Sequence, residues 1–186
     1  MKPPVKYISD FVAAPDNALT SLQTELEWER RDDAPRSEYY CNDFPFPYQY
    51  GRGRGQREYL PRPYNDTIMR IRKSLELMTN SVFEVCFLNR YLNQSDQLGW
   101  HADDSPEMDD SRPIGIVSFG VEREIWFKPK DLSIKSEPVK LKLGHGSLCV
   151  MEAGMQDSWL HRIPKASFQC GERISLTFRG YVKPTI

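Results

Sequence analysis

The chain has 186 residues and a formal net charge of −1, so it is long enough for one sizeable hydrophobic core and short for two. A net charge near zero excludes a positive field over the whole protein as a basis for binding nucleic acid, so only a local basic patch would serve. The sequence has neither the apolar run of a signal peptide nor the roughly 20 apolar residues that span a bilayer, and we expect no membrane contact.

The N-terminal part predicts a strand, a helix and an irregular segment. Residues 5–12 read as a short strand, and residues 16–31 follow as a helix with Asp16 as its N-cap and leucines on its apolar side. Between residues 31 and 66 the content of proline, glycine and tyrosine argues against a helix. We predict an irregular, partly extended excursion there.

A second helix is predicted over residues 67–79, with Asp66 as the candidate N-cap. Apolar residues recur along it at helical spacing and mark the face that packs on the core. The basic residues Arg70, Arg72 and Lys73 are expected to stay in solvent.

From residue 82 onward the hydrophobic period changes to two, which predicts strands. The candidate strands are residues 82–92, 114–120, 124–129, 139–143, 147–153 and 173–182. Because no helical pattern separates them, an antiparallel sandwich or jelly roll is favoured over a parallel α/β sheet. The fold class is therefore mainly β (α+β), with the N-terminal helices packed outside the strands.

The sequence contains three histidines, and two of them suit a metal site. A non-haem iron(II) centre uses two imidazoles and one carboxylate. His101 and Asp103 are two residues apart and can reach one ion from the same side of a strand, while His161 lies in an aromatic and apolar setting. His145 sits in a glycine-flanked turn and is interpreted as structural. Two alternatives remain: the pair arises by chance in a solvated acidic loop, or the site is a zinc hydrolase centre, which typically draws on more imidazole or thiolate ligands.

The predicted strand at residues 173–182 carries an unusual polar face. Strand alternation places Arg173, Ser175, Thr177 and Arg179 on one side. An arginine facing a barrel interior is costly unless an anion pairs with it, so this face predicts an anionic ligand. The arginines are about 20 Å apart by strand rise, which is too far for a small diacid to bridge linearly, so strand twist, side-chain reach or different roles must be involved. The alternative is an exposed edge strand whose arginines are solvated.

A second strand offers further polar groups. Phe87, Asn89 and Tyr91 share one face, and the amide and the phenol could both hydrogen-bond the same diacid. They could equally be ordinary sheet residues.

Taken together, these stretches resemble the AlkB-like branch of the iron(II)- and 2-oxoglutarate-dependent dioxygenases. The resemblance rests, in order and in spacing, on LNRYLNQSDQLGWHADDS, LHRI and RISLTFR, and it covers roughly residues 80–183. It implies a double-stranded β-helix (cupin-like) core, with O2 as a further cosubstrate. The implied iron(II) ligands are His101, Asp103 and His161, and the implied 2-oxoglutarate contacts are Asn89, Tyr91, Arg173, Ser175 and Arg179. Arg173 would pair with the distal carboxylate, and Arg179 would lie near the metal.

The resemblance also implies the reaction, which is oxidative removal of an N-alkyl group from a nucleic-acid base with release of formaldehyde. A target base inside a duplex would have to be flipped out or already be single-stranded. Two alternatives remain open: a 2-oxoglutarate-dependent hydroxylase or demethylase of a protein or small molecule, and a non-enzymatic binding module with a vestigial pocket.

Three features depart from the family pattern. Ser175 stands where the family commonly has asparagine, and Ser105 stands where relatives usually carry an acidic residue facing the base. The segment before Ala34 shows no aromatic finger of the kind that duplex-repairing members insert into the stack. We therefore expect single-stranded DNA or RNA as the substrate.

The segment PYQYGRGRGQREY interleaves tyrosines and arginines, a combination that can stack on bases and meet phosphates. We expect Tyr48 or Tyr50 to stack on the substrate base. The arginines expected to steer the backbone are Arg36, Arg52 and Arg54, and Asp104 and Ser105 are placed on the substrate side. The alternative is a solvated, tyrosine-rich loop that packs on the core.

The organisation follows from these assignments. Residues 1–80 are interpreted as N-terminal helices and a nucleotide-recognition segment, and residues 81–186 as the dioxygenase core, within one compact domain. The four cysteines form no CxxC pair, which indicates a reducing compartment without a disulfide framework. We expect an intracellular, cytoplasmic monomer from a bacterial or viral source, or a nuclear protein if the source is eukaryotic.

Overall fold

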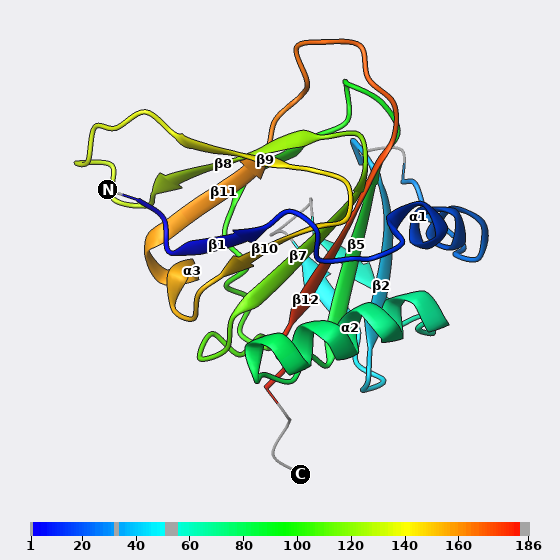
Figure 1. Ribbon diagram of the computed structural model, residues 1–186. Coiled ribbons are helices and arrows are strands. Elements are labelled where there is room, and N and C mark those ends of the chain that lie inside the picture. The colour runs from blue at the N-terminus through cyan, green and yellow to red at the C-terminus, as the bar shows by residue number, and fades with distance from the viewer. Residues whose placement is uncertain (1, 32–33, 51–55, 183–186) are drawn as a thin grey trace.

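Two antiparallel sheets form the body of the protein, seen in a computed structural model that describes residues 2–31, 34–50 and 56–182 (Figure 1). Within these ranges the larger sheet has the strand order β1 (Val5–Ile8), β10 (Ser147–Met151), β7 (Ile114–Gly120), β12 (Arg173–Arg179), β5 (Val85–Tyr91) and β2 (Ser37–Asn42). The smaller sheet has the order β6 (Leu98–His101), β11 (Trp159–Ile163), β8 (Arg123–Pro129) and β9 (Val139–Leu143). A separate two-stranded antiparallel sheet consists of β3 (Tyr48–Tyr50) and β4 (Arg57–Tyr59). The mainly β, antiparallel prediction is confirmed.

Helices α1 (Pro15–Thr24) and α2 (Asp66–Thr79) cover the outer face of the larger sheet (Figure 1). Their apolar sides join one buried cluster with the outward side chains of the sheet, including Leu22 and Leu75 from the helices and Leu176 from β12. Burying a leucine side chain stabilises the fold by about 1.5–3 kcal/mol, so this layer fixes the sheet from outside and leaves its other face for the site.

The first helix is shorter than the sequence predicts, and the capping prediction is wrong. It ends at Thr24 instead of residue 31, and Ala14 occupies the N-cap position without a side-chain hydrogen bond, while Asp16 lies in the first turn. Beyond the helix, Glu29 exchanges backbone hydrogen bonds with Glu38 of β2. Tertiary pairing of the backbone thus outweighs the local helical propensity of this stretch.

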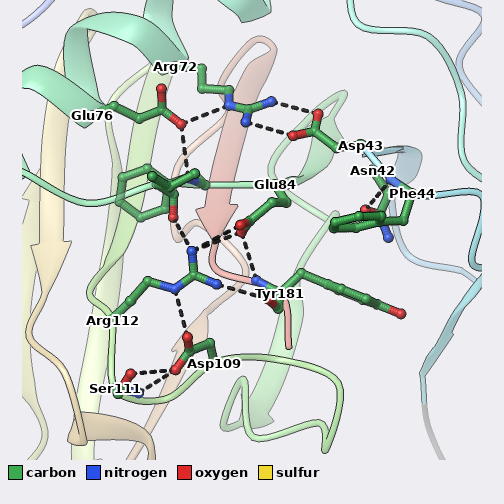
Figure 2. Close-up of polar contacts among 12 residues, drawn as sticks. Asn42, Asp43, Phe44, Arg72, Glu76, Glu84, Asp109, Ser111, Arg112 and Tyr181 are labelled. Carbon is green, nitrogen blue, oxygen red and sulfur yellow. Dashed lines mark hydrogen bonds and ion pairs between the residues drawn. The ribbon is translucent and has the colours of Figure 1, made fainter. Parts of the chain in front are cut away.

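The second helix agrees with the predicted range, but its cap and one of its arginines do not. Asn65 is the N-cap and its side-chain oxygen accepts a hydrogen bond from the Ile68 amide at 2.9 Å. Arg72, expected in solvent, is buried against the Asp43 and Glu76 carboxylates (Figure 2). Spacing alone could not reveal this position, because Asp43 comes from the segment that the sequence left irregular.

Several strands differ from their predicted ranges. β1 ends at Ile8 rather than at residue 12, β2 lies within the segment predicted to be irregular, and the short helix α3 (Met155–Ser158) was not predicted. β1 and β2 pair with β10 and β5, so residues 1–80 and 81–186 share one sheet. No helix in the described part of the chain is long and apolar enough to cross a membrane.

Candidate metal and cosubstrate site

Two histidines and an aspartate meet on the inner face of the smaller sheet. His101 is the last residue of β6 and pairs directly with His161 of β11, so their ring centroids lie 4.2 Å apart. Asp103 lies two residues beyond the end of β6. The antiparallel register therefore brings together three side chains that are up to sixty residues apart in the chain.

The geometry suits one metal ion. The Nε2 atoms of His161 and His101 lie 3.7 Å and 3.8 Å from the two Asp103 carboxylate oxygens, and the three ligand atoms are all within 4.8 Å of one another. Two imidazoles and one carboxylate form the facial set that binds iron(II) and leaves open positions for other ligands. The donor set predicted from the sequence is thus assembled in the fold, and it fits iron(II).

The histidines are held in the form that a metal requires. His101 Nδ1 lies 2.8 Å from the Gly99 carbonyl, which can only accept, so Nδ1 carries the proton and Nε2 carries the lone pair that a metal would take. Burial lowers the pKa of His101, and burial together with the neighbouring His101 lowers the pKa of His161 to about 3. Both imidazoles are therefore neutral at physiological pH.

Asp103 is kept ionised by its neighbours. Burial raises its pKa, but its neighbours, the Arg179 guanidinium first among them, outweigh burial and the net pKa is lowered. Arg179 Nη1 donates to Asp103 Oδ1 at 3.3 Å. The Asp103 backbone amide donates to the buried Gln156 Oε1 at 2.9 Å, so α3 fixes the chain where the carboxylate leaves the sheet. Sequence reasoning missed Gln156, which no motif marks.

The inner face of the larger sheet carries the predicted anion-binding residues. In the register of β12 with β5, Arg173 pairs with Tyr91 and Ser175 pairs with Asn89. On its other side Ser175 pairs with Ser118 of β7. The polar face of β12 therefore lies in the middle of the sheet, which rules out the exposed edge strand.

Arg173 has no protein anion to neutralise it. Its side chain is fully enclosed, at 0% exposure, and Nη2 donates to Ser118 Oγ at 2.8 Å. Its Nε and Nη1 atoms are buried without a hydrogen-bond partner in the described chain. Its guanidinium carbon lies 5.3 Å from the centre of the Tyr91 ring, and burial lowers its pKa to about 10. A carboxylate bound beside the guanidinium would offer acceptors to these N–H groups and supply the missing charge.

One cavity joins the two half-sites. Its walls include the three metal-ligand candidates, both β12 arginines and Asn89, together with Arg36 and Tyr48 from the N-terminal segment. Apolar residues such as Ile116 and Leu98 fill the remaining wall. The predicted metal and diacid sites therefore open into the same space.

Arg36 lies in this wall, so its expected contact with a nucleic-acid backbone needs correction. It is buried, pairs with Glu38 at 2.6 Å and donates from Nε to Asn89 Oδ1 at 2.5 Å. Glu38 in turn accepts from the Tyr59 hydroxyl at 2.6 Å. Arg36 is therefore occupied inside the protein, where it orients the Asn89 amide.

The other substrate-side predictions fall in different places. Tyr48 is buried at 3% exposure, its ring lies 5.0 Å from the Arg179 guanidinium carbon, and its hydroxyl lies 3.3 Å from Ser105 Oγ. Asp104 pairs with Lys130 at 2.8 Å. Tyr50 ends β3, and Arg52 and Arg54 lie outside the described residues.

The third histidine has the structural role expected for it. His145 Nδ1 accepts a hydrogen bond from the Gly120 amide at 2.9 Å, and Nε2 lies 3.1 Å from Asp16. Gly120 has a φ of 84°, a conformation that favours glycine, so this histidine stabilises the turn after β7.

Comparison with known proteins gives three similarities. A family model described as the 2OG-Fe(II) oxygenase superfamily matches residues 18–179. DNA oxidative demethylase ALKBH2 from Homo sapiens is 36% identical over 124 residues, covering 64% of this chain and 48% of the relative. Alpha-ketoglutarate-dependent dioxygenase alkB homolog 3 from Bos taurus is 30% identical over 178 residues, covering 88% of this chain and 60% of the relative. The chain thus spans about half the length of the ALKBH2 proteins it matches.

Among solved structures, that of OsALKBH1 is similar in fold. The TM-score is 0.68 over 97% of this chain and 98% of that chain, with 15% sequence identity. At this identity the likeness concerns the architecture alone, and it agrees with the jelly-roll prediction.

Proposed function

The chain belongs to the 2OG-Fe(II) oxygenase superfamily, and from this premise we propose that it is an oxidative demethylase that removes N-alkyl groups from nucleic-acid bases. The relatives named as DNA oxidative demethylases support the substrate class. The observation that carries the proposal is the single cavity that joins a two-histidine, one-carboxylate cluster to a buried arginine lacking an anion.

The residues have distinct tasks in this proposal. His101, Asp103 and His161 would hold iron(II), and Arg173 would take the distal carboxylate of 2-oxoglutarate. Bound there, iron(II) and 2-oxoglutarate would supply the electrons that activate O2: one oxygen atom would enter succinate as 2-oxoglutarate loses CO2, and the other would hydroxylate an N-alkyl carbon, which then leaves as formaldehyde. The protein itself contributes binding, orientation and a closed, low-dielectric environment.

Polar neighbours complete the cosubstrate pocket. Asn89 and Tyr91 face the cavity from β5, and Ser175 lies between them and β7. Because Asn89 Oδ1 accepts from Arg36, its amide nitrogen is the group left to donate toward the cavity. Arg179 holds the Asp103 carboxylate and so acts at the metal end.

We place the target base beside Tyr48. This ring lines the cavity, and its hydroxyl contacts Ser105, the residue two positions after Asp103. An aromatic wall next to the metal ligands is suited to stacking on a flipped or unpaired base. A preference for single strands is part of this proposal and follows from the absence of an aromatic finger before Ala34 in the sequence.

The test is turnover of methylated single-stranded oligonucleotides with iron(II), ascorbate and 2-oxoglutarate. We expect formaldehyde release together with the loss of one methyl group by mass spectrometry. His161→Ala should abolish both, whereas His145→Ala, which removes a histidine outside the cavity, should retain them in the folded fraction. Succinate formation without methyl loss would contradict the nucleic-acid substrate and favour a protein or small-molecule target.

We also propose that the protein acts as a monomer inside the cell. One chain already supplies the metal-ligand cluster and both β12 arginines that the proposed reaction needs, and all four cysteines are free thiols, as a reducing compartment requires. Light scattering at working concentrations tests the oligomeric state, and a stable dimer would contradict it.

A further inference from the structure

A row of tryptophan and basic side chains crosses the outer face of the smaller sheet, on the side opposite the two metal-site histidines. Following the strand order β6, β11, β8 and β9, the row consists of Trp100, Arg162, Trp126 and Lys140, with Lys128 beside Trp100. We call these five residues the cation–aromatic row. None of them belongs to the cavity wall.

The sheet itself builds the row. Arg162 pairs in register with Trp126, which pairs in register with Lys140. The Arg162 guanidinium carbon lies 4.7 Å from the centre of the Trp100 ring and 4.3 Å from that of Trp126. Lys140 Nζ lies 4.3 Å from Trp126, and Lys128 Nζ lies 4.7 Å from Trp100. The rings therefore hold three cations in fixed positions across four strands.

These three cations differ from several other arginines of the protein because no ion pair with a carboxylate is found for them in the described chain. Arg30, Arg72 and Arg90 each form an ion pair shorter than 3 Å with an acidic side chain. In the described chain no ion pair is found for Arg162, Lys128 or Lys140, and Arg162 Nε is buried without a hydrogen-bond partner. One carboxylate lies at the row, because Glu124 Oε2 accepts a hydrogen bond from Trp126 Nε1 at 2.7 Å. With three cations against this one acidic group, the row is still a local positive surface on a protein whose net charge is −1.

We propose that the cation–aromatic row binds the backbone of a single-stranded nucleic acid whose target nucleotide occupies the cavity; this deepens the proposed function and rests on it. Phosphates would neutralise the unpaired cations and draw the flexible lysine side chains away from the indole rings, so that bases could stack on the ring faces that the lysines now cover. Sequence-independent binding of this kind needs a charged track with aromatic platforms and no base-specific contacts.

The position of the cation–aromatic row supports the view that one nucleic-acid strand can reach both the row and the cavity. β6 is an edge strand, and Trp100 is next to His101, with Asp103 just beyond. A single-stranded nucleic acid that leaves the cavity over the β6 edge therefore meets Trp100 first. Crossing from β6 to β9 takes three strand spacings, about 14 Å. That length suits a short site of about four nucleotides, the lower end for single-strand binding surfaces.

The test measures binding of unmodified oligothymidylates of 5 and 20 nucleotides by fluorescence anisotropy at several salt concentrations. The variant Lys128→Ala/Lys140→Ala is compared with Lys6→Ala/Lys73→Ala, which removes the same charge from exposed positions on β1 and α2. We expect the first variant to bind the 20-mer about tenfold more weakly and to lower the slope of log K against log salt by about 1.4. The 5-mer, which is long enough to cover the row, should lose affinity in the same direction, whereas both lengths with the control variant should change less than about twofold.

A second variant tests the aromatic part. Trp126→Leu keeps all the charges, so it should weaken binding of the 20-mer about tenfold, as expected from the loss of one stacked base, and leave the salt slope unchanged. Turnover of a methylated 20-mer by Lys128→Ala/Lys140→Ala should show a raised KM at an unchanged kcat.

The proposal is overturned if the control pair loses as much affinity as the row variant, or if the row variant keeps the wild-type slope. Competition by a polyglutamate peptide as effective as that by the 20-mer would also overturn it and would assign the row to an acidic protein. The binding assay needs no turnover. A failure of demethylation with the slope change intact would therefore count against the proposed function and leave the row standing.

Discussion

Arg72 and Arg173 are both buried arginines next to a tyrosine ring, yet they differ in what satisfies them. All three nitrogens of the Arg72 guanidinium donate to the Asp43 and Glu76 carboxylates (Figure 2). Arg173 donates from one nitrogen to a serine and keeps the other two buried without a partner. Each cation lies about the same distance from its tyrosine, 5.5 Å from Tyr64 and 5.3 Å from Tyr91.

This difference separates a structural arginine from a binding arginine. A buried cation whose hydrogen bonds are complete stabilises the chain that surrounds it, whereas one left incomplete costs free energy until a ligand supplies the missing acceptors. Burial accordingly lowers the pKa of Arg173, while the carboxylates around Arg72 outweigh burial and raise its pKa. The contrast makes opposite predictions for substitution at the two positions.

The largest expected effect is on activity at Arg173. Arg173→Leu should lower 2-oxoglutarate-dependent turnover by about 100-fold or more, because the distal carboxylate loses the buried counter-charge that no protein carboxylate pairs with. In the absence of ligand the variant should unfold at the same free energy as wild type or higher, since an unsatisfied cation has been removed.

Thermal unfolding with and without 2-oxoglutarate measures both parts of this prediction. The cosubstrate should raise the melting temperature of wild type and not that of Arg173→Leu, because a ligand stabilises only the state that binds it. Equal ligand shifts in both proteins would show that Arg173 does not hold the diacid.

The next effect is on stability at Arg72. Arg72→Leu should lower the free energy of unfolding by about 2–3 kcal/mol, less than the 3–5 typical of a fully buried pair because the Asp43 side chain is 36% exposed. Urea unfolding measures it. Turnover per folded molecule should be unchanged, and a large loss of kcat would contradict the division between the two arginines.

The polar face of β12 is the part of the site that the sequence predicts best. Alternation alone places Arg173 and Arg179 on one side, and the register with β5 confirms that arrangement. Gln156 and Ser118 escaped prediction because they act through single contacts made across the fold, one to a backbone amide and one to a guanidinium. Neither contact leaves a periodic or spaced pattern in the chain.

The N-terminal segment is the part of the site that the sequence predicts least well. Arg36 looked like a surface cation because it lies in a stretch rich in proline and tyrosine, but β2 pairs with β5 and carries its neighbours into the larger sheet. Long-range pairing of strands, absent from any local window, decides whether an arginine faces solvent or a cavity. Arg72 was misjudged for the same reason, since its partner Asp43 follows β2.

Substitution of Gln156 tests whether the hydrogen bond that positions the Asp103 backbone affects metal affinity. Gln156→Met removes the acceptor for the Asp103 amide and should weaken iron(II) affinity about tenfold, the lower end for residues that orient a ligand. Gln156→Glu keeps an acceptor at the same place and should recover most of the affinity. Titration of the metal-free protein with iron(II) under anaerobic conditions measures both variants, and unchanged affinity in the methionine variant would contradict a positioning role.

The smallest effect concerns a second fully bonded arginine, Arg112, which donates to Asp109 and Glu84 side chains and to the Tyr181 carbonyl (Figure 2). It joins the loop after Asp103 to the start of β5 and the end of β12. A Cβ atom added at Gly180 would lie 2.2 Å from Arg112 Nε. Since Gly180 has no positive φ, the space and not the backbone demands glycine there.

Gly180→Ala should therefore lower the free energy of unfolding by about 1–2 kcal/mol by pushing the guanidinium out of its network. In an Arg112→Ala background the same change should cost nothing further, because the clash and the network are both gone. The coupling energy from this double-mutant cycle, measured by urea unfolding, should thus equal the single-variant cost of Gly180→Ala. If the two costs in the free energy of unfolding are additive, Gly180→Ala does not act through Arg112. The proposed clash between the added methyl group and the Arg112 guanidinium would then be wrong.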